Sequence, residues 1–172
     1  MSRIAHDLIA ELRLGRIRTV AFVVRGDVRW TLPLYELALA TARRGWSMGI
    51  ADARYWFVTP EPVPLAGFGS AARAAVSARL EPEGITFVGS TFADLRPGAV
   101  LLDPQGECIE VDRVVTLGES ARITAIDFEQ VVLHPGAGGR VLTSSTRSWG
   151  TQRGHDCTPL GGTSGPQPVR VR

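Results

Sequence analysis

The stretch from Val24 to Ala38 is the part of this sequence whose residue types best suit ligand chemistry. It follows a short apolar run that is typical of a buried strand. In open α/β sheets, ligands bind beyond the carboxyl ends of the strands, where a phosphate can face a helix N-terminus. Arg25 and Arg29 lie in this stretch and could hold a phosphate, although a pair of solvated arginines would give the same pattern.

A phosphate-binding loop of the dinucleotide type would contain Gly-x-Gly-x-x-Gly. Its glycines permit a tight turn and a close approach of the backbone to the ligand. In this sequence only Gly26 remains of that pattern. The residues alone therefore give a weak phosphate-loop signal, and Gly26 equally suits an ordinary turn.

Other residue types that could do chemistry are scattered along the chain. Cys108 and Cys157 are far apart, and the three histidines form no ligand spacing, so we predict no catalytic residue, disulfide framework or metal site. Four aromatic residues could stack on a cofactor ring or pack in the core: Trp30, Tyr35, Tyr55 and Trp56.

The elements that must position the loop follow from hydrophobic periodicity. We expect Pro33 in the first turn of a helix that Gly45 ends, and Ser70 as the cap of a later helix. The predicted helices span 4–15, 34–44 and 71–80, and the predicted strands span 18–24, 54–59 and 85–88. A small antiparallel meander is expected from strands at 99–102, 108–111 and 114–117, the first two joined by a turn at 103–106. The fold class is α/β, with a parallel sheet in β-α-β-α-β order followed by this meander.

Composition excludes several classes of protein. All 19 basic residues are arginine and none is lysine, which fits the coding bias of a GC-rich genome as well as it fits phosphate binding. A net charge of +2 predicts no nucleic-acid partner, and no apolar run approaches the ~20 residues of a membrane span. We expect no secretory signal and a cytoplasmic location.

The composition changes near residue 131. Residues 128–172 are rich in glycine, proline, serine and threonine, have no apolar periodicity and carry the net positive charge. They are predicted to form a disordered, irregular tail. One hypothesis is that this tail is read out of frame, in which case shifting the frame near codons 128–132 would restore a Gly-Asp segment.

Several segments together resemble a known family. The run RGDVRWTLPLYELAL and the later segments FVTPE, AGFG and VDRVVTL resemble the second dinucleotide-binding domain of bacterial FAD/NAD(P)-dependent pyridine nucleotide-disulphide oxidoreductases. The branch that includes type II NADH dehydrogenases and sulfide:quinone oxidoreductases is the most similar. The resemblance covers about residues 4–127 and implies a Rossmann-like unit interrupted by a β-meander.

The resemblance also implies roles for particular residues. Gly26 would lie at the pyrophosphate, Glu36 would point toward the nicotinamide, and Glu61 would accept hydrogen bonds from the adenosine ribose. Arg25 would hold a phosphate, such as that of NADP. Each has an ordinary alternative: a turn glycine, a glutamate favoured by the helix dipole, and solvated charges.

These observations lead to two functional hypotheses. In the first, residues 1–127 are the NAD(P)H-binding domain of an FAD-dependent oxidoreductase. The chain would then be a fragment that lacks the FAD-binding segments. In the second, the chain is a non-enzymatic α/β module that binds a nucleotide or a partner protein, and the face that the FAD domain would cover is available for self-association. A receiver-like signalling domain is disfavoured because no acidic cluster follows the first strand.

Overall fold

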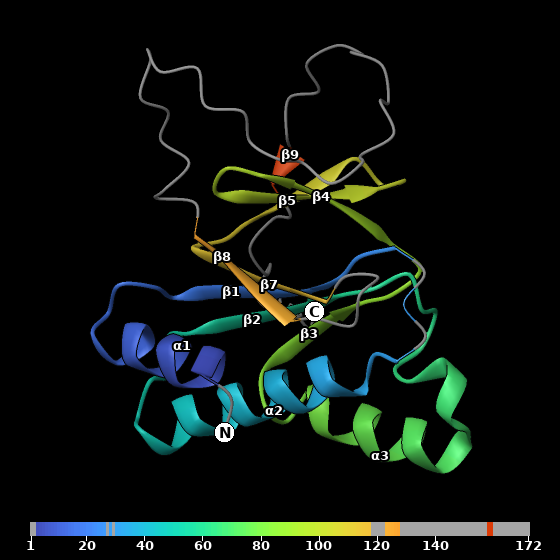
Figure 1. Ribbon diagram of the computed structural model, residues 1–172, viewed down its shortest axis with the longest axis horizontal. Helices are drawn as coiled ribbons and strands as arrows, with labels where there is room; N and C mark the ends of the chain where they lie inside the picture. The colour runs from blue at the N-terminus through green and yellow to red at the C-terminus, as the bar shows by residue number, and fades with distance from the viewer. Residues whose placement is uncertain (1–2, 27, 29, 118–122, 128–157, 160–172) are drawn as a thin grey trace, which may run out of the picture.

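The computed structural model describes residues 3–26, 28, 30–117, 123–127 and 158–159. Three layers are stacked in it: helices on one face of a five-stranded sheet, and a smaller sheet on the other face (Figure 1). The helices are α1 (Arg3–Arg13), α2 (Leu32–Ser47), η1 (Ala66–Phe68) and α3 (Ser70–Leu80). The strands are β1 (Thr19–Val24), β2 (Arg54–Val58), β3 (Ile85–Val88), β4 (Phe92–Arg96), β5 (Ala99–Asp103), β6 (Glu107–Glu110), β7 (Arg113–Leu117), β8 (Ile123–Asp127) and β9 (Thr158–Pro159).

The large sheet has the strand order β3-β2-β1-β7-β8. The first four strands run parallel, and β8 pairs antiparallel with β7. All six residues of the central strand β1 are buried, as its unbroken apolar run predicts for a strand covered on both faces. The predicted α/β class and the β-α-β-α-β order are confirmed.

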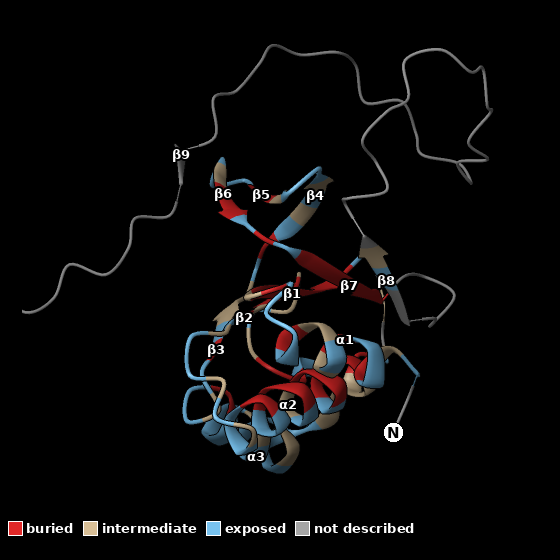
Figure 2. Ribbon diagram, turned by 90° about the vertical axis from the view of Figure 1, so that its left-hand side faces the viewer, coloured by how far each residue is buried: buried red, intermediate tan, exposed pale blue. Residues whose placement is uncertain are grey.

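Two hydrophobic cores hold the layers together. One lies between the helices and the large sheet and includes Phe22, Phe57 and Leu34. The other lies between the large sheet and the small one and includes Val23, Val100 and Ile109. Figure 2 shows the burial along the chain: β1 and β7 are buried throughout, whereas α3 is mostly exposed or half-buried.

The meander differs from the prediction. Residues 92–96 form its first strand, β4, which sequence reasoning missed because its pattern of exposed and half-buried positions carries little apolar signal. Residues 113–117 leave the meander and pair with β1 as the parallel strand β7. All five residues of β7 are buried, which is the pattern of a central parallel strand. The turn at 103–106 does join two antiparallel strands, β5 and β6, as predicted.

Two predicted helix ends were wrong. Helix α2 continues through Gly45 to Ser47, and Gly45 instead allows close packing, because a Cβ there would lie 2.5 Å from the Tyr55 hydroxyl. Ser70 is the first residue of α3 and not its cap; Gly69 occupies the N-cap position, with no side-chain cap hydrogen bond. The predicted proline in the first turn of α2 is confirmed.

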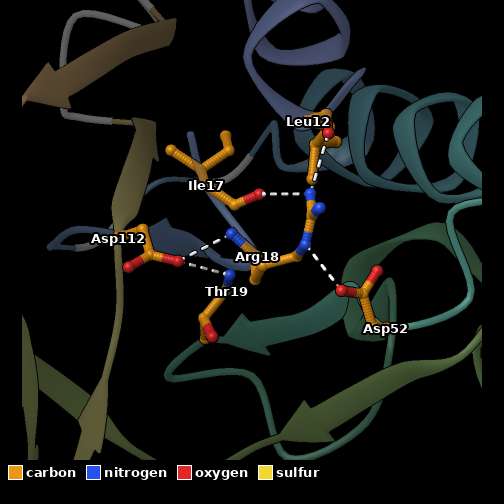
Figure 3. Close-up of polar contacts among 6 residues, drawn as sticks. All are labelled: Leu12, Ile17, Arg18, Thr19, Asp52 and Asp112. Atoms are coloured by element: carbon orange, nitrogen blue, oxygen red, sulfur yellow. Dashed lines mark hydrogen bonds and ion pairs between the residues drawn. The ribbon is translucent and has the colours of Figure 1, made fainter. Parts of the chain in front are cut away.

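A network of polar contacts holds the amino ends of the parallel strands of the large sheet, here called its amino edge (Figure 3). The Asp112 carboxylate accepts hydrogen bonds from the backbone N–H groups of Arg18 and Thr19, at 2.7 and 2.8 Å. The Arg18 guanidinium donates to the carbonyl oxygen of Leu12 at 2.9 Å and pairs with Asp52 at 2.6 Å. The start of β1 is thereby tied to β7, to α1 and to the loop before β2.

Within the predicted tail 128–172, the structure describes only Thr158–Pro159, which pairs in parallel with Glu107 and Cys108 of β6. The rest of that prediction lies outside the described residues. None of the helices in the described part of the chain is long and apolar enough to cross a membrane.

Candidate functional site

The strand order places a candidate site at the carboxyl end of β1. The chain passes from β1 through α2 to β2 on one side, and β7 pairs with β1 on the other side. In open parallel sheets, ligands bind in the crevice where neighbouring connections diverge in this way. The segments at this edge are residues 25–31, the segment after β2 and the end of β7.

The turn after β1 begins with a fixed backbone. The Arg25 N–H donates to the carbonyl oxygen of Leu117 at 2.8 Å, which extends the pairing of β1 with β7 by one residue. Gly26 follows with a φ of 69°, in the left-handed region that favours glycine. Both residues are exposed. Gly26 therefore makes the turn that the sequence suggested, and its role toward a pyrophosphate stays a prediction.

Helix α2 begins with few backbone donors available to a ligand. The carbonyl oxygen of Thr31 accepts from the N–H groups of Leu34 and Tyr35, at 3.0 and 3.4 Å. Pro33 has no N–H. Of the first-turn residues, only Leu32 could still donate its N–H to a bound anion.

Glu61, which follows β2, is brought to the start of α2. Its carboxylate accepts a hydrogen bond from Thr31 Oγ1 at 3.3 Å and another from the Tyr35 hydroxyl at 3.1 Å. Tyr35 is fully buried and its ring stacks on Phe57, with centroids 3.9 Å apart. Burial, and then the neighbouring Glu61 carboxylate, raise the pKa of Tyr35. The Glu61 carboxylate therefore has a fixed orientation, and it keeps lone pairs for other donors.

The backbone around Glu61 is also held in place. The Ser90 N–H donates to the carbonyl oxygen of Glu61 at 3.0 Å, and the Glu61 N–H donates to Thr59 Oγ1 at 3.2 Å. Gly89 packs against this segment so closely that a Cβ would lie 2.7 Å from the Glu61 carbonyl oxygen. Sequence reasoning missed Gly89, since a glycine after a strand does not reveal a close approach between segments.

An aromatic pair lies at the same edge. Trp30, directly before Thr31, is 56% exposed, and its ring lies 5.2 Å from that of Phe68 in η1, centroid to centroid. Leu65, at the start of η1, is buried and adopts a φ of 52°. Of the four aromatic residues considered from sequence, Tyr35 and Tyr55 are buried and Trp30 is the most exposed.

The other predicted site residues lie elsewhere or on the surface. Glu36 is exposed and borders a groove of about 490 Å³ between α2 and α3, beside Arg43 and Arg79. It therefore does not join Glu61. Cys108 is buried in β6, and the described residues contain no cluster of side chains that could hold a metal ion. The roles of Glu36 and Arg25 stay predictions.

Comparison with known proteins gives partial structural similarities. No protein-family model matches the chain, and no curated protein matches it. A sulfide:quinone oxidoreductase from Aquifex aeolicus is 23% identical over 54% of this chain and 23% of its own, with a TM-score of 0.47. A ferredoxin reductase from Rhodopseudomonas palustris is 15% identical over 63% of this chain and 25% of its own, with a TM-score of 0.46. An NAD-dependent persulfide reductase from A. fulgidus is 14% identical over 67% of this chain and 20% of its own, with a TM-score of 0.44. The chain spans a quarter or less of the length of these proteins.

Proposed function

We propose that residues 1–127 form a nucleotide-binding domain that holds the nicotinamide dinucleotide NAD(P)H at the carboxyl edge of the large sheet. The observation that carries the proposal is the position of Glu61. It lies just beyond β2, next to the start of the helix that follows β1, with its carboxylate oriented by Thr31 and Tyr35. In dinucleotide-binding folds, an acidic residue in this region accepts hydrogen bonds from a ribose.

The remaining roles follow the sequence resemblance. Gly26 would let the chain turn beneath the phosphates, and the exposed Arg25 would supply a positive charge there. Glu36 would act toward the nicotinamide end. Glu36 lies on the outer side of α2, beside Arg43 and Arg79, and Glu36→Gln in the NADH titration below tests this assignment.

In the resembling family, NAD(P)H passes hydride to FAD, and the protein supplies binding and orientation. We assign no described residue of this chain to FAD, so we propose no hydride transfer on this chain alone. The FAD-binding part would have to come from another polypeptide segment. Purified protein is then expected to show no flavin absorption and no turnover of NAD(P)H without an added flavin domain.

Calorimetric titration of the full chain with NADH and with NADPH tests the proposal. We expect an affinity of about micromolar for at least one of them. Glu61→Gln should weaken binding by about tenfold, because a neutral amide accepts hydrogen bonds from a ribose less strongly than a carboxylate does. Glu110→Gln is the matched control, since Glu110 is an exposed glutamate on β6 that lines a different groove, together with Arg18 and Asp112 at the amino ends of the strands.

The result decides between the two functional hypotheses. Absence of binding to both dinucleotides would refute the dinucleotide proposal. The exposure of Trp30 favours, as a second candidate, a module that binds another protein or a second copy of itself. If the occupant is a second copy, this candidate predicts a molecular mass that rises with concentration in analytical ultracentrifugation and falls back in Trp30→Ser.

A further inference from the structure

The start of α2 is a poor site for a pyrophosphate. A dinucleotide-binding helix normally presents several free N–H groups to the anion, next to glycines that let the backbone approach it. Here Pro33 has no N–H and the Leu34 N–H donates to the Thr31 carbonyl oxygen, so at most the Leu32 N–H remains. Trp30, Thr31 and Leu32 all carry side chains at this point, and Thr31 is completely buried.

The negative charge of Glu61 also makes the start of α2 unfavourable for a pyrophosphate. The carboxylate of Glu61 lies 3.3 Å from Thr31 Oγ1, directly beside the helix start. A phosphate placed at the helix start would meet this negative charge together with few donors, because the positive charge of the exposed Arg25 precedes the helix by seven residues. A neutral hydroxyl can instead donate to the carboxylate, whose two oxygens each keep acceptor capacity after the bonds from Thr31 and Tyr35.

The neighbouring surface suits a flat ring. Trp30 adjoins Thr31 in the chain, and Phe68 follows Glu61 by seven residues in the loop after β2. Their rings form a tilted pair at 51°, and the Trp30 ring is about half exposed, so part of it is open to a stacking partner. Aromatic side chains bind nucleobases in this way without needing a charge.

We infer that this edge recognises the nucleoside end of its ligand, a flat base with vicinal hydroxyls, and takes little binding energy from the pyrophosphate. The inference rests on the proposed function in that NADH is one of the ligands compared. It assigns Trp30 to the base and Glu61 to the hydroxyls. The helix N-terminus that usually holds the phosphates would have no major role.

The test compares adenosine, NADH and inorganic pyrophosphate on the full chain by calorimetry. We expect the Kd values of adenosine and NADH to agree within about threefold, and pyrophosphate not to compete with adenosine. Trp30→Leu should raise the Kd of adenosine by about tenfold. Trp46→Leu is the control, because Trp46 is a similarly exposed tryptophan (51%) at the other end of α2. Both substitutions lie on the surface, and circular dichroism would report the fold of each variant.

Each outcome has a distinct meaning. NADH binding more than about tenfold tighter than adenosine, or displacement of adenosine by pyrophosphate, would overturn this inference and leave the proposed function standing. Equal adenosine binding in the wild type and Trp30→Leu would also overturn it. Adenosine binding without NADH binding would support nucleoside recognition and refute the proposed function. Absence of binding to both would refute both.

Discussion

Raising the pH above 10 should destabilise this protein through its two buried tyrosines. Burial, and then the Glu61 carboxylate, raise the pKa of Tyr35, and burial with nearby Asp52 raises that of Tyr55. The chain has no lysine, so tyrosines are the side chains with ordinary pKa values near 10. Apart from the buried thiol of Cys108, whose ordinary pKa is about 8.5, the alkaline stability profile should therefore report these two side chains.

The sign follows from which state releases its proton first. The unfolded tyrosine ionises near pH 10, whereas the folded Tyr35 keeps its proton, so base stabilises the unfolded chain. The stabilising contribution is complete below about pH 10 and is lost progressively above it. For a group that stays protonated in the folded state, the loss at about pH 11 is about 1.4 kcal/mol. Tyr55 adds a loss in the same direction.

Phenylalanine variants separate the two residues. Tyr35→Phe removes the hydrogen bond to Glu61 and should cost about 1.5–3 kcal/mol at neutral pH. Its deficit relative to the wild type should then shrink by about 1.4 kcal/mol on going to about pH 11. The Tyr55 hydroxyl is buried and has no hydrogen-bond partner within the described part of the chain. The free energy of unfolding of Tyr55→Phe should therefore equal that of the wild type or exceed it by up to about 1 kcal/mol.

The assay is urea unfolding at constant ionic strength from about pH 8 to about pH 11, followed by tryptophan fluorescence, with tyrosinate absorbance of the folded protein as a second readout. The reasoning would be refuted if the folded protein formed tyrosinate with a midpoint near pH 10. It would also be refuted if the stability of Tyr35→Phe fell in parallel with that of the wild type.

Substitutions at three further positions test the packing and polar contacts of the fold, each by urea unfolding near neutral pH. Gly89→Ala should lower the free energy of unfolding by about 1–3 kcal/mol, because its Cβ would lie 2.7 Å from the Glu61 carbonyl oxygen. The same substitution should weaken adenosine binding. Unchanged adenosine binding would mean that the segment around Gly89 is not part of the site. Asp112→Ala should lower the free energy of unfolding by about 1 kcal/mol, because two N–H groups at the start of β1 lose their acceptor. Asp112→Asn keeps an acceptor oxygen and should recover part of this loss. Equal stability of the two variants would argue against Asp112 as the acceptor for these N–H groups. Glu11→Gln should lower the free energy of unfolding by about 2 kcal/mol, because it breaks the 2.7 Å ion pair between Glu11 and the Arg113 side chain, which is 10% exposed. A loss as small as that of a surface ion pair would contradict the prediction that this pair stabilises the fold.

The parts of the fold that could be predicted from sequence are those with strong local patterns. The apolar run of β1, the helical spacing in α1 and the turn at 103–106 each depend on a few adjacent residues. The placement of β7 could not be predicted, because its pairing with β1 joins segments about 90 residues apart. The role of Gly45 also depends on a distant partner, the Tyr55 hydroxyl on β2.

The same distinction applies to the candidate site. Glu61 and Gly26 could be proposed because each follows a recognisable strand. The hydrogen bonds that Thr31 and Tyr35 donate to Glu61 could not be predicted, because they join residues that are 30 and 26 positions apart in the sequence. The role of Glu36 stays a prediction: its motif position placed it on α2 but could not say which face of the helix it occupies, and it lies on the exposed face, toward α3.

The two ends of β1 lead to different expectations for substitutions. At the amino end, Asp112 and Arg18 satisfy backbone groups and join α1, β1 and β7, so substitutions there should lower stability. At the carboxyl end, we propose that Glu61, which keeps acceptor capacity, and Trp30, which keeps exposed ring surface, contact a ligand, so Glu61→Gln and Trp30→Leu should change ligand affinity in addition to any change in stability. A protein whose carboxyl edge were only structural would show the same stability loss at both ends and no change in ligand affinity at either. The adenosine titration of Glu61→Gln beside that of Asp112→Asn separates these cases.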